Sequence, residues 1–456
     1  MEAIWKTAES VDSYKLRATK YQSLVQHAIK NNLISDEQPV IDVFDFDEFD
    51  ARLQDLLSAF PEEEITHGLA VKSQPLSGVL RYAIEKYPRI GTECASLQEA
   101  IHGRNLGAKP ENVIYDSPVK SKYELREAMK QGFYINLDNY GEMKMVAEVL
   151  KEIPDTKSTF GLRVNPLVEG GAIAALSTAG ANSKFGLIMC EETFPQILAY
   201  YQEFPWLAGI HCHVGSQGCP IEMGVHGCKR ILEGALKIND KLGKKQITCL
   251  DIGGGVPTSY WTDEEAHSFA EYRQMLDEKV PELFKSGFRI LTEFGRSMFA
   301  KYGCTLTKVA FIKGSDEKDE CLISKYRASQ GQNQLMLVFV GSNSFVREAY
   351  QMDIGKWRRR FTLFDKNGEG KFGDFKKQDI AGPLCFQGDY LCKDVPLPEN
   401  ANDEDVLVMH DTGAYTMAMY SKYNSRPCQA VYGKFGDELK CIKERETNED
   451  CLKFWG

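Results

Sequence analysis

Short apolar runs alternate with longer amphipathic stretches between about residues 50 and 300. Each run is short enough for a strand buried on both faces, and the stretches that follow mix apolar and charged residues as a surface helix does. The runs cover residues 68–71, 112–115, 133–137, 160–164, 209–214, 248–252 and 289–292. About eight strand–helix units in roughly 250 residues match the length and rhythm of a (β/α)8 barrel. We therefore predict an α/β fold with a TIM-like barrel over residues 46–300.

The two ends of the chain have a different texture. The first 35 residues or so are typical of a helix, and residues 39–46 alternate apolar and acidic positions like a half-buried strand. After residue 300, short β-like runs at 335–340, 406–410 and 429–432 are separated by polar stretches, which predicts a mostly-β second domain, a β-barrel or β-sandwich. We expect residues 314–334 and 365–379 to be exposed loops. No metal site is predicted, because the second loop has Lys376 where a calcium loop needs an acid.

Composition narrows the class of protein. The 456 residues carry a formal net charge of −10, which disfavours binding to nucleic acid. No apolar run reaches the ~18 residues of a membrane helix, and the acidic start lacks the apolar core of a secretory signal, so we expect no membrane association. The 13 cysteines are an odd number without paired CxxC spacing. A reduced, cytoplasmic protein is the simplest interpretation.

Lys72 is the first candidate for chemistry. It ends the apolar run in Ala70-Val71-Lys72-Ser73, where a lysine is costly unless it is paired or used. An amine whose pKa is lowered by burial or by neighbouring cations can form a Schiff base with an aldehyde. Taken alone, a lysine at this position is more often a side chain that reaches to solvent.

Further candidates follow the later apolar runs, where active sites of barrels are built. Glycines 253–255 let backbone amides approach an anion, although a tight turn is the commoner reason for such a triplet. Ser216 offers a hydroxyl, and His213 can stack on a ring or be an ordinary core histidine. Glu293 can hold a proton on a pyridine nitrogen, and Arg296 can bind a phosphate or a carboxylate. Together they are what a cofactor with an aldehyde, a phosphate and a pyridine ring requires.

The order of these motifs resembles that of the fold-type III pyridoxal-phosphate decarboxylases, whose barrel is alanine racemase-like. The similarity is greatest to the diaminopimelate decarboxylases and more distant to the ornithine decarboxylases. It extends over about residues 39–453 and rests on segments 70–72, 163–166, 176–178 with 184–186, 213–217, 251–255, 293–297, 382–385 with 388–389, 411–415, 423–427, and 445–447 with 449–450.

The resemblance implies a role for each barrel residue. Lys72 would bind pyridoxal 5'-phosphate as a Schiff base, and His213 would stack on its ring. Glu293 would pair with the pyridine nitrogen, and Glu93 would lie near the ring. The phosphate would be bound by a set from both domains, which comprises Ser216, Gly253, Gly254, Gly255, Gly295, Arg296 and Tyr415.

The resemblance also implies a homodimer with shared active sites. Cys385 would come from the partner subunit and donate a proton after carbon dioxide leaves. The family places the N-terminal segment in the second domain, so residues 1–45 and 301–456 would form that domain together. The small-molecule substrate, an amino acid, would contact Arg296, Arg347, Phe386, Gln387, Asp389 and Tyr415.

Several departures from the pattern concern the substrate. The diaminopimelate enzymes have Cys-Glu-x-Gly-Asp, whose glutamate binds the distal ammonium, but this chain has Phe386 after Cys385. A phenyl ring cannot accept that hydrogen bond. The family's Arg-x-x-x-Tyr pair is Arg347 with Gln351, and its Glu-Pro-Gly-Arg has Phe294 for proline. The basic run 356–360 is by default a solvated face, and alternatively binds an anionic substrate.

We therefore expect a decarboxylase whose substrate is not diaminopimelate. A racemase or another Cα reaction is the enzyme alternative, with Cys385 as the second base. A non-catalytic regulatory paralogue is the alternative from another class, and it is disfavoured because the lysine, the glutamate and the phosphate ligands are all present.

Overall fold

The computed structural model describes residues 11–168, 178–318, 320–350 and 359–456. They form two compact units. One unit comprises residues 50–258 and 265–298, and the other comprises residues up to 49, 259–264 and 299–456. Each unit has its own sheet.

The first of these units is a closed parallel barrel. Neighbouring strands pair in the order β5-β4-β3-β2-β10-β9-β8-β6, and β5 also pairs with β6, which closes the ring of eight. The strands are β2 (Ile65–Ala70), β3 (Ile90–Cys94), β4 (Val113–Asp116), β5 (Tyr134–Leu137), β6 (Thr159–Asn165), β8 (Leu207–His211), β9 (Cys249–Asp251) and β10 (Arg289–Thr292), with the short β7 (Leu187–Ile188) beside β6. The predicted (β/α)8 barrel is confirmed, and β3 is the strand that the apolar runs did not reveal.

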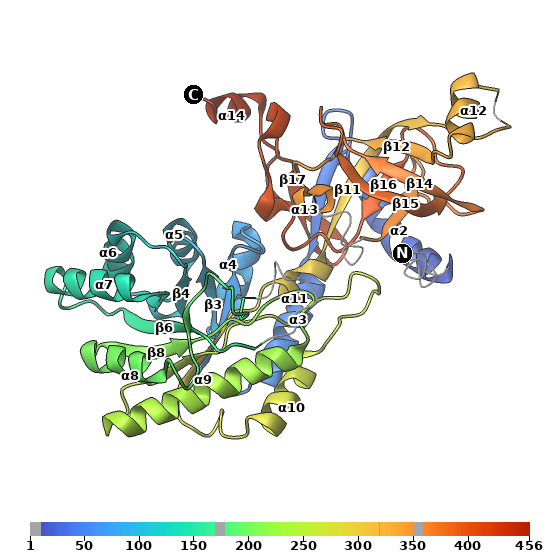
Figure 1. The fold of residues 1–456 in the computed structure, drawn as a ribbon. Coiled ribbons are helices and arrows are strands. Elements are labelled where there is room, and N and C mark those ends of the chain that lie inside the picture. The colour runs from blue at the N-terminus through green and yellow to red at the C-terminus, as the bar shows by residue number, and fades with distance from the viewer. Residues whose placement is uncertain (1–10, 169–177, 319, 351–358) are drawn as a thin grey trace. The chain divides into compact units, whose positions relative to one another are not determined.

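Helices follow the barrel strands and lie around them in Figure 1. They are α3 (Phe46–Ala59), α4 (Ser77–Lys86), α5 (Leu97–Asn105), α6 (Lys122–Gln131), α7 (Tyr140–Glu152), α8 (Phe194–Glu203), α9 (Ile221–Leu242), α10 (Phe269–Lys279) and α11 (Arg296–Phe299), with a 3-10 turn at Pro110–Asn112. Capping boxes at Ser121 and Ser268 start α6 and α10, because each serine accepts from the amide three residues on.

The second unit is built on a nine-stranded sheet, so the predicted mostly-β domain is present. Its strands are β1 (Val40–Asp45), β11 (Gly303–Lys313), β12 (Gln334–Val338), β13 (Phe361–Phe364), β14 (Phe375–Ala381), β15 (Tyr390–Pro398), β16 (Val406–Met409), β17 (Ala430–Phe435) and β18 (Glu438–Lys443). β1 lies between β11 and β17 and pairs with both. The N-terminal strand therefore belongs to the C-terminal sheet, as the resemblance implied.

Short and long helices complete this unit. They are α2 (Val11–Lys30), α12 (Leu322–Ser329), α13 (Val346–Tyr350) and α14 (Asn448–Lys453), with 3-10 turns at Ala300–Tyr302, Met417–Met419 and Tyr423–Ser425. The buried Tyr14 fixes α2: its hydroxyl donates to the Lys371 carbonyl and accepts from the Leu363 amide. The two predicted exposed loops are partly wrong, because residues 314–334 contain α12 and residues 365–379 contain the start of β14.

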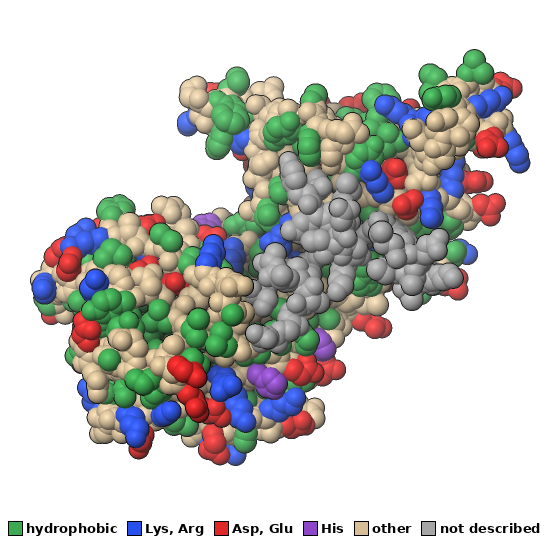
Figure 2. Space-filling model, in the orientation of Figure 1, with side chains coloured by type: hydrophobic (Ala, Val, Ile, Leu, Met, Phe, Trp, Pro, Cys, Tyr) green, Lys and Arg blue, Asp and Glu red, His purple; other side chains and the backbone are tan. Residues whose placement is uncertain are grey.

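The surface carries charges of both signs. On the face shown in Figure 2, Lys and Arg side chains are interspersed with Asp and Glu among the residues that the structure describes. None of the described helices is both long and apolar enough to cross a membrane.

Candidate active site

Charged side chains converge where the barrel strands end. Asp116, His211 and Asp251 are the last residues of β4, β8 and β9, and Glu293 directly follows β10. Glu93 is the next-to-last residue of β3. The carboxyl ends of parallel barrel strands meet at one face, which is where barrel enzymes carry out chemistry.

Lys72 lies in the turn after β2. The turn is anchored on both sides, because the Ala70 amide donates to the Phe294 carbonyl at 3.0 Å and the Val71 amide donates to the Glu93 carbonyl at 2.9 Å. The side chain of Lys72 is 41% exposed and its Nζ forms an ion pair with the buried carboxylate of Glu93. The lysine is therefore both paired and partly exposed. The amine lies beyond the strand end, where its neighbour is a carboxylate, and where a bound molecule can reach it.

Glu293 is a buried carboxylate that can accept a further hydrogen bond. Its Oε1 has no hydrogen-bond partner, and its Oε2 lies 3.8 Å from Nε2 of His211 and 3.9 Å from Nδ1 of His213. Burial, and then the charge of Asp251, raise the pKa of Glu293 well above its usual value. A buried oxygen without a partner points to a missing donor at this position.

The glycine triplet lies beside these groups, after β9. Gly253 and Gly255 have φ of +66° and +110°, which side chains rarely adopt, and a Cβ on Gly254 would lie 2.0 Å from the Glu293 carbonyl oxygen. The Gly253 amide donates to Asp251 Oδ1 and the Gly254 amide to His213 Nδ1. Among the described backbone contacts the Gly255 amide has no acceptor, so it remains available to an anion.

His213 is held with its Nδ1 as an acceptor. The Gly254 amide donates to that nitrogen at 3.2 Å, and the Thr178 hydroxyl donates to the His213 carbonyl. Burial, reinforced by the charges of Arg163 and Lys72, lowers the pKa of His213 well below its usual value. The ring is therefore neutral, and its remaining proton is on Nε2.

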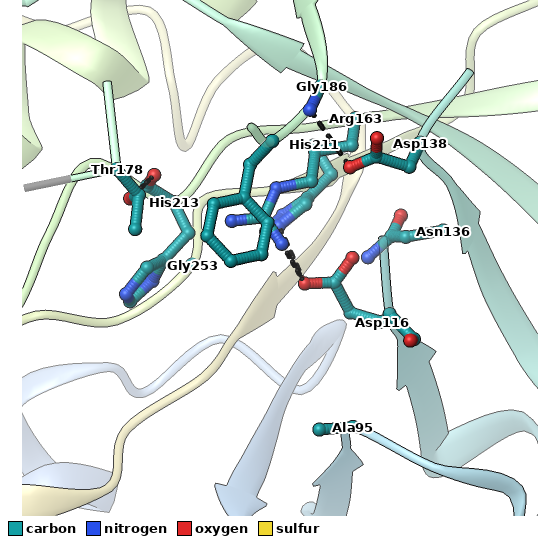
Figure 3. A network of polar contacts seen from close by, with 12 residues as sticks. Ala95, Asp116, Asn136, Asp138, Arg163, Thr178, Gly186, His211, His213 and Gly253 are labelled. Atoms are coloured by element: carbon teal, nitrogen blue, oxygen red, sulfur yellow. Dashed lines mark hydrogen bonds and ion pairs between the residues drawn. The ribbon is translucent and has the colours of Figure 1, made fainter. Parts of the chain in front are cut away.

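Sequence reasoning missed a network around Asp116. Arg163 on β6 forms an ion pair with Asp116, and Figure 3 shows its guanidinium reaching that carboxylate with His211 beside it. Asn136 on β5 donates to Asp251 Oδ2 at 2.8 Å. Each of these residues lies on a barrel strand, close to its carboxyl end. Their position on the strands is the signal that could have identified them.

Phe294, the departure from Glu-Pro-Gly-Arg, has a packing role. It is buried, and its ring centroid lies 4.8 Å from that of Phe269 and 6.1 Å from that of Tyr272. A proline would leave that space empty. Gly295 follows it, and Arg296 is buried at the start of α11. Ser216 lies in the loop after β8 and is half-buried.

The remaining predicted site residues lie in the other unit. Cys385 is exposed on the loop between β14 and β15, where its amide donates to Asn424 and its carbonyl accepts from the Tyr423 hydroxyl. Phe386 and Gln387 are exposed beside it. Asp389 is different: it is buried, and its two oxygens accept the Ser342 and Leu384 amides at 2.6 and 2.8 Å. Asp389 thereby orders the loop that presents Cys385.

Arg347 and Tyr415 also meet in this unit. The Arg347 guanidinium lies 4.6 Å from the centre of the Tyr415 ring, and Tyr415 has φ of +55°. The expected partner Gln351 lies outside the described residues, as do residues 176–177 of one quoted segment.

The basic run 356–360 is only partly described, and both interpretations of its last two residues were wrong. Arg359 and Arg360 are buried. Arg359 donates to Glu348, and Arg360 donates to Asp411 and Asp263. Their charges are neutralised inside the unit, so these two arginines form neither a solvated face nor a site for an anionic substrate.

Comparison with known proteins identifies the barrel. Residues 46–300 match the family model "Pyridoxal-dependent decarboxylase, pyridoxal binding domain". Diaminopimelate decarboxylase of Helicobacter pylori is 25% identical over 415 residues, which are 90% of this chain and 93% of that protein. Diaminopimelate decarboxylase of Zymomonas mobilis is 28% identical over 84% of each chain.

Solved structures share the fold. The crystal structure of Helicobacter pylori diaminopimelate decarboxylase complexed with L-lysine has a TM-score of 0.79 at 22% identity, and the match covers 93% of this chain and 99% of that one. The arginine decarboxylase of Paramecium bursaria Chlorella virus has a TM-score of 0.72 at 20% identity, with 91% and 100% covered. With the family model spanning more than half of its length, the chain belongs to the pyridoxal-dependent decarboxylases, enzymes of the carboxy-lyase class that use pyridoxal phosphate.

Proposed function

We propose that this enzyme decarboxylates an amino acid other than diaminopimelate, with Lys72 as the residue that binds the cofactor covalently. The observation that supports this most is the grouping of an accessible lysine, a neutral histidine and a buried carboxylate at the carboxyl ends of the barrel strands. These are groups that pyridoxal phosphate requires, and they are supplied by β2, β8 and β10.

The residues present fit that cofactor. Glu293 Oε1 is a buried acceptor without a donor, which suits a protonated ring nitrogen. The Gly255 amide, which has no acceptor among the described backbone contacts, can donate to the phosphate. When bound, the cofactor supplies an electron-withdrawing ring that stabilises the negative charge left after carbon dioxide departs.

The chain's own residues hold and orient the reacting groups. Lys72 supplies the amine that binds the cofactor's aldehyde, and Glu93 accepts a proton from that amine. Glu293 holds a proton at the ring nitrogen, and the neutral face of His213 packs against the ring. Ser216, Arg296 and Tyr415 bind the phosphate together with the glycine triplet.

Cys385 donates the proton that replaces the lost carboxylate, and it does so from the second subunit of a homodimer. Support comes from the family resemblance and from the exposure of Cys385 on a loop that Asp389 holds in place. The thirteen cysteines of the chain are all free, which favours the reducing environment of the cytoplasm.

The substrate carries no ammonium group at its distal end. Phe386, 36% exposed, stands where the diaminopimelate enzymes have the glutamate that binds that ammonium. Because Arg359 and Arg360 are paired inside the unit, an uncharged distal end is favoured over an anionic one that these two arginines would bind.

The test is a measurement of carbon dioxide release from a panel of amino acids. The panel contains meso-diaminopimelate, lysine and ornithine beside amino acids with uncharged or acidic distal ends. We expect release from an uncharged member and little from diaminopimelate. Racemisation without release, from any member of the panel, would contradict decarboxylation.

A further inference from the structure

Three charged or polar side chains lie in a row on the neighbouring barrel strands β6, β8 and β9. Arg163 on β6 is the register partner of His211 on β8, and His211 is the register partner of Asp251 on β9. All three are buried. Residues at one level of a barrel face the same interior layer, so His211 lies between a cation and an anion.

His211 makes contacts with three carboxylates. Its Nδ1 lies 3.3 Å from Asp251 Oδ2, and its Nε2 lies 3.6 Å from Asp116 Oδ2 and 3.8 Å from Glu293 Oε2. Asp116 is already neutralised by Arg163. Two carboxylates, those of Asp251 and Glu293, therefore share one imidazole as their nearby compensating group.

The charges around the His211 imidazole determine whether it is protonated. The acidic groups around the His211 imidazole are Asp116 from β4, Asp251 from β9, Glu293 after β10 and, more distantly, Glu93 on β3. The basic groups of the same layer are Arg163, Lys72 and His213. Glu93 pairs with Lys72, and Asp116 with Arg163. A neutral His211 would leave the carboxylates of Asp251 and Glu293 without a cation beside them in a dry interior, which is costly unless one of them takes up a proton.

We propose that His211 is a lasting imidazolium whose function is to oppose the protonation of Glu293, which makes it a positioning residue for the carboxylate at the ring nitrogen. Burial alone would lower the pKa of His211, but the charges of Asp251, Glu293 and Asp116 outweigh burial and raise it well above its usual value. The inference rests on the proposed function only in assigning Glu293 to the ring nitrogen.

The same geometry distinguishes His211 from the other buried barrel histidine. His67 on β2 has Thr292 as its partner, at 2.9 Å from Nδ1, and burial lowers its pKa to about 3. It is neutral and contacts no carboxylate that the structure describes. His67→Asn is therefore a matched control for the loss of a buried histidine from a barrel strand.

The Asp116, His211 and Glu293 atoms lie within 4.8 Å of one another and are residue types that bind metal ions. The paired Arg163 cation repels a second cation at this position. A change in the His211 signals on addition of Zn²⁺ or Mg²⁺, abolished by a chelator, would favour a metal site and overturn the proposal.

The direct test is nuclear magnetic resonance of the full-length protein with 15N-labelled histidine, before and after addition of pyridoxal phosphate. One histidine, identified by its loss in His211→Asn, should keep both ring nitrogens protonated between about pH 6 and 9. His67, identified through His67→Asn, should remain neutral over that range. A neutral His211 at about pH 8 would overturn the proposal whatever becomes of the cofactor assignment.

A second measurement follows the proton at Glu293. With ring-15N pyridoxal phosphate bound, the cofactor nitrogen signal in His211→Asn should shift from the protonated towards the unprotonated position, because Glu293 takes up the proton that it no longer holds at the ring. In the Glu293→Gln background the same substitution should add little shift. If His211→Asn shifts the cofactor nitrogen signal equally in the wild-type and Glu293→Gln proteins, or if His67→Asn gives a similar shift, the role of His211 is only structural and the proposal is overturned. Since the histidine signals need no cofactor, failure of the proposal and failure of the proposed function are distinguishable.

Discussion

Lys72 and Glu93 form an ion pair across the ends of two neighbouring barrel strands, with the lysine partly exposed and the glutamate fully buried. Burial raises the pKa of Glu93, and Lys72 opposes that rise. The carboxylate therefore depends on this amine for compensation, and it is placed to take a proton from it. The pair supports Lys72 as the residue that binds the aldehyde of the cofactor.

Replacing Lys72 should remove covalent cofactor binding. We expect Lys72→Ala to lose the visible absorbance of the bound cofactor and all measurable turnover, because the structure offers no second amine beside Glu93 among the described residues. Borohydride reduction of the wild type should label the peptide that contains Lys72. Lys122→Ala, on an exposed helix, should behave like wild type. A label on another lysine would refute the assignment.

Glu293→Gln should separate cofactor binding from turnover. The amide keeps the size of the side chain but cannot stabilise a positive ring nitrogen, so kcat should fall by roughly a hundredfold to a thousandfold while the cofactor still binds. Steady-state kinetics with the cofactor in excess measures this. An unchanged kcat would show that another group protonates the ring.

Complementation tests whether Cys385 acts between subunits. Lys72→Ala and Cys385→Ala should each be inactive alone, and mixing them should restore about a quarter of wild-type activity, since half of randomly mixed dimers contain one intact composite site. Mixing Lys72→Ala with Glu293→Gln is the control, because both changes affect the barrel and should give no recovery. No recovery in the first mixture, with subunit exchange verified, would place the site within one chain.

The Phe386 position should govern discrimination against a distal ammonium. A charged hydrogen bond contributes about 1.5–3 kcal/mol, so Phe386→Glu should raise kcat/KM for diaminopimelate by roughly tenfold to a hundredfold. Gln332→Glu adds the same charge at an exposed position before β12, outside the proposed site, and should have little effect. Efficient turnover of diaminopimelate by the wild type would show that Phe386 is a tolerated substitution and not a determinant of the substrate.

His67 should make the protein less stable in acid. Its pKa is about 3 in the folded protein and about 6.5 when unfolded, so between these values only the unfolded chain binds the proton. The free energy of unfolding should thus fall as the pH drops below about 6.5, by about 2 kcal/mol at pH 5 from this residue. Denaturant unfolding of His67→Asn should show a smaller loss between pH 8 and 5 than wild type. The exposed His226→Asn should retain the full loss.

The amino-acid sequence determined the barrel and which polar residues lie at the ends of its strands. Apolar runs with period and length typical of buried strands fixed where β2, β4–β6 and β8–β10 lie, and chemistry-bearing residues at their ends followed from the polarity of the parallel barrel. β3 was not predicted, because its sequence Ile90-Gly91-Thr92-Glu93-Cys94 contains a glutamate and is therefore not a continuous apolar run. Only the pairing with Lys72 makes that burial acceptable.

Tertiary structure alone decided which charges meet. Asp116, Arg163, His211 and Asp251 are scattered over more than a hundred residues of sequence, and they converge because β4, β6, β8 and β9 end in one layer of a closed ring. The same holds for Arg359 and Arg360, whose basic run predicted a surface, while the fold buries them against Glu348, Asp411 and Asp263. The sequence shows how many cationic residues the chain has, but not which carboxylates they contact. Burial and distance, which exist only in the folded state, determine what each one neutralises.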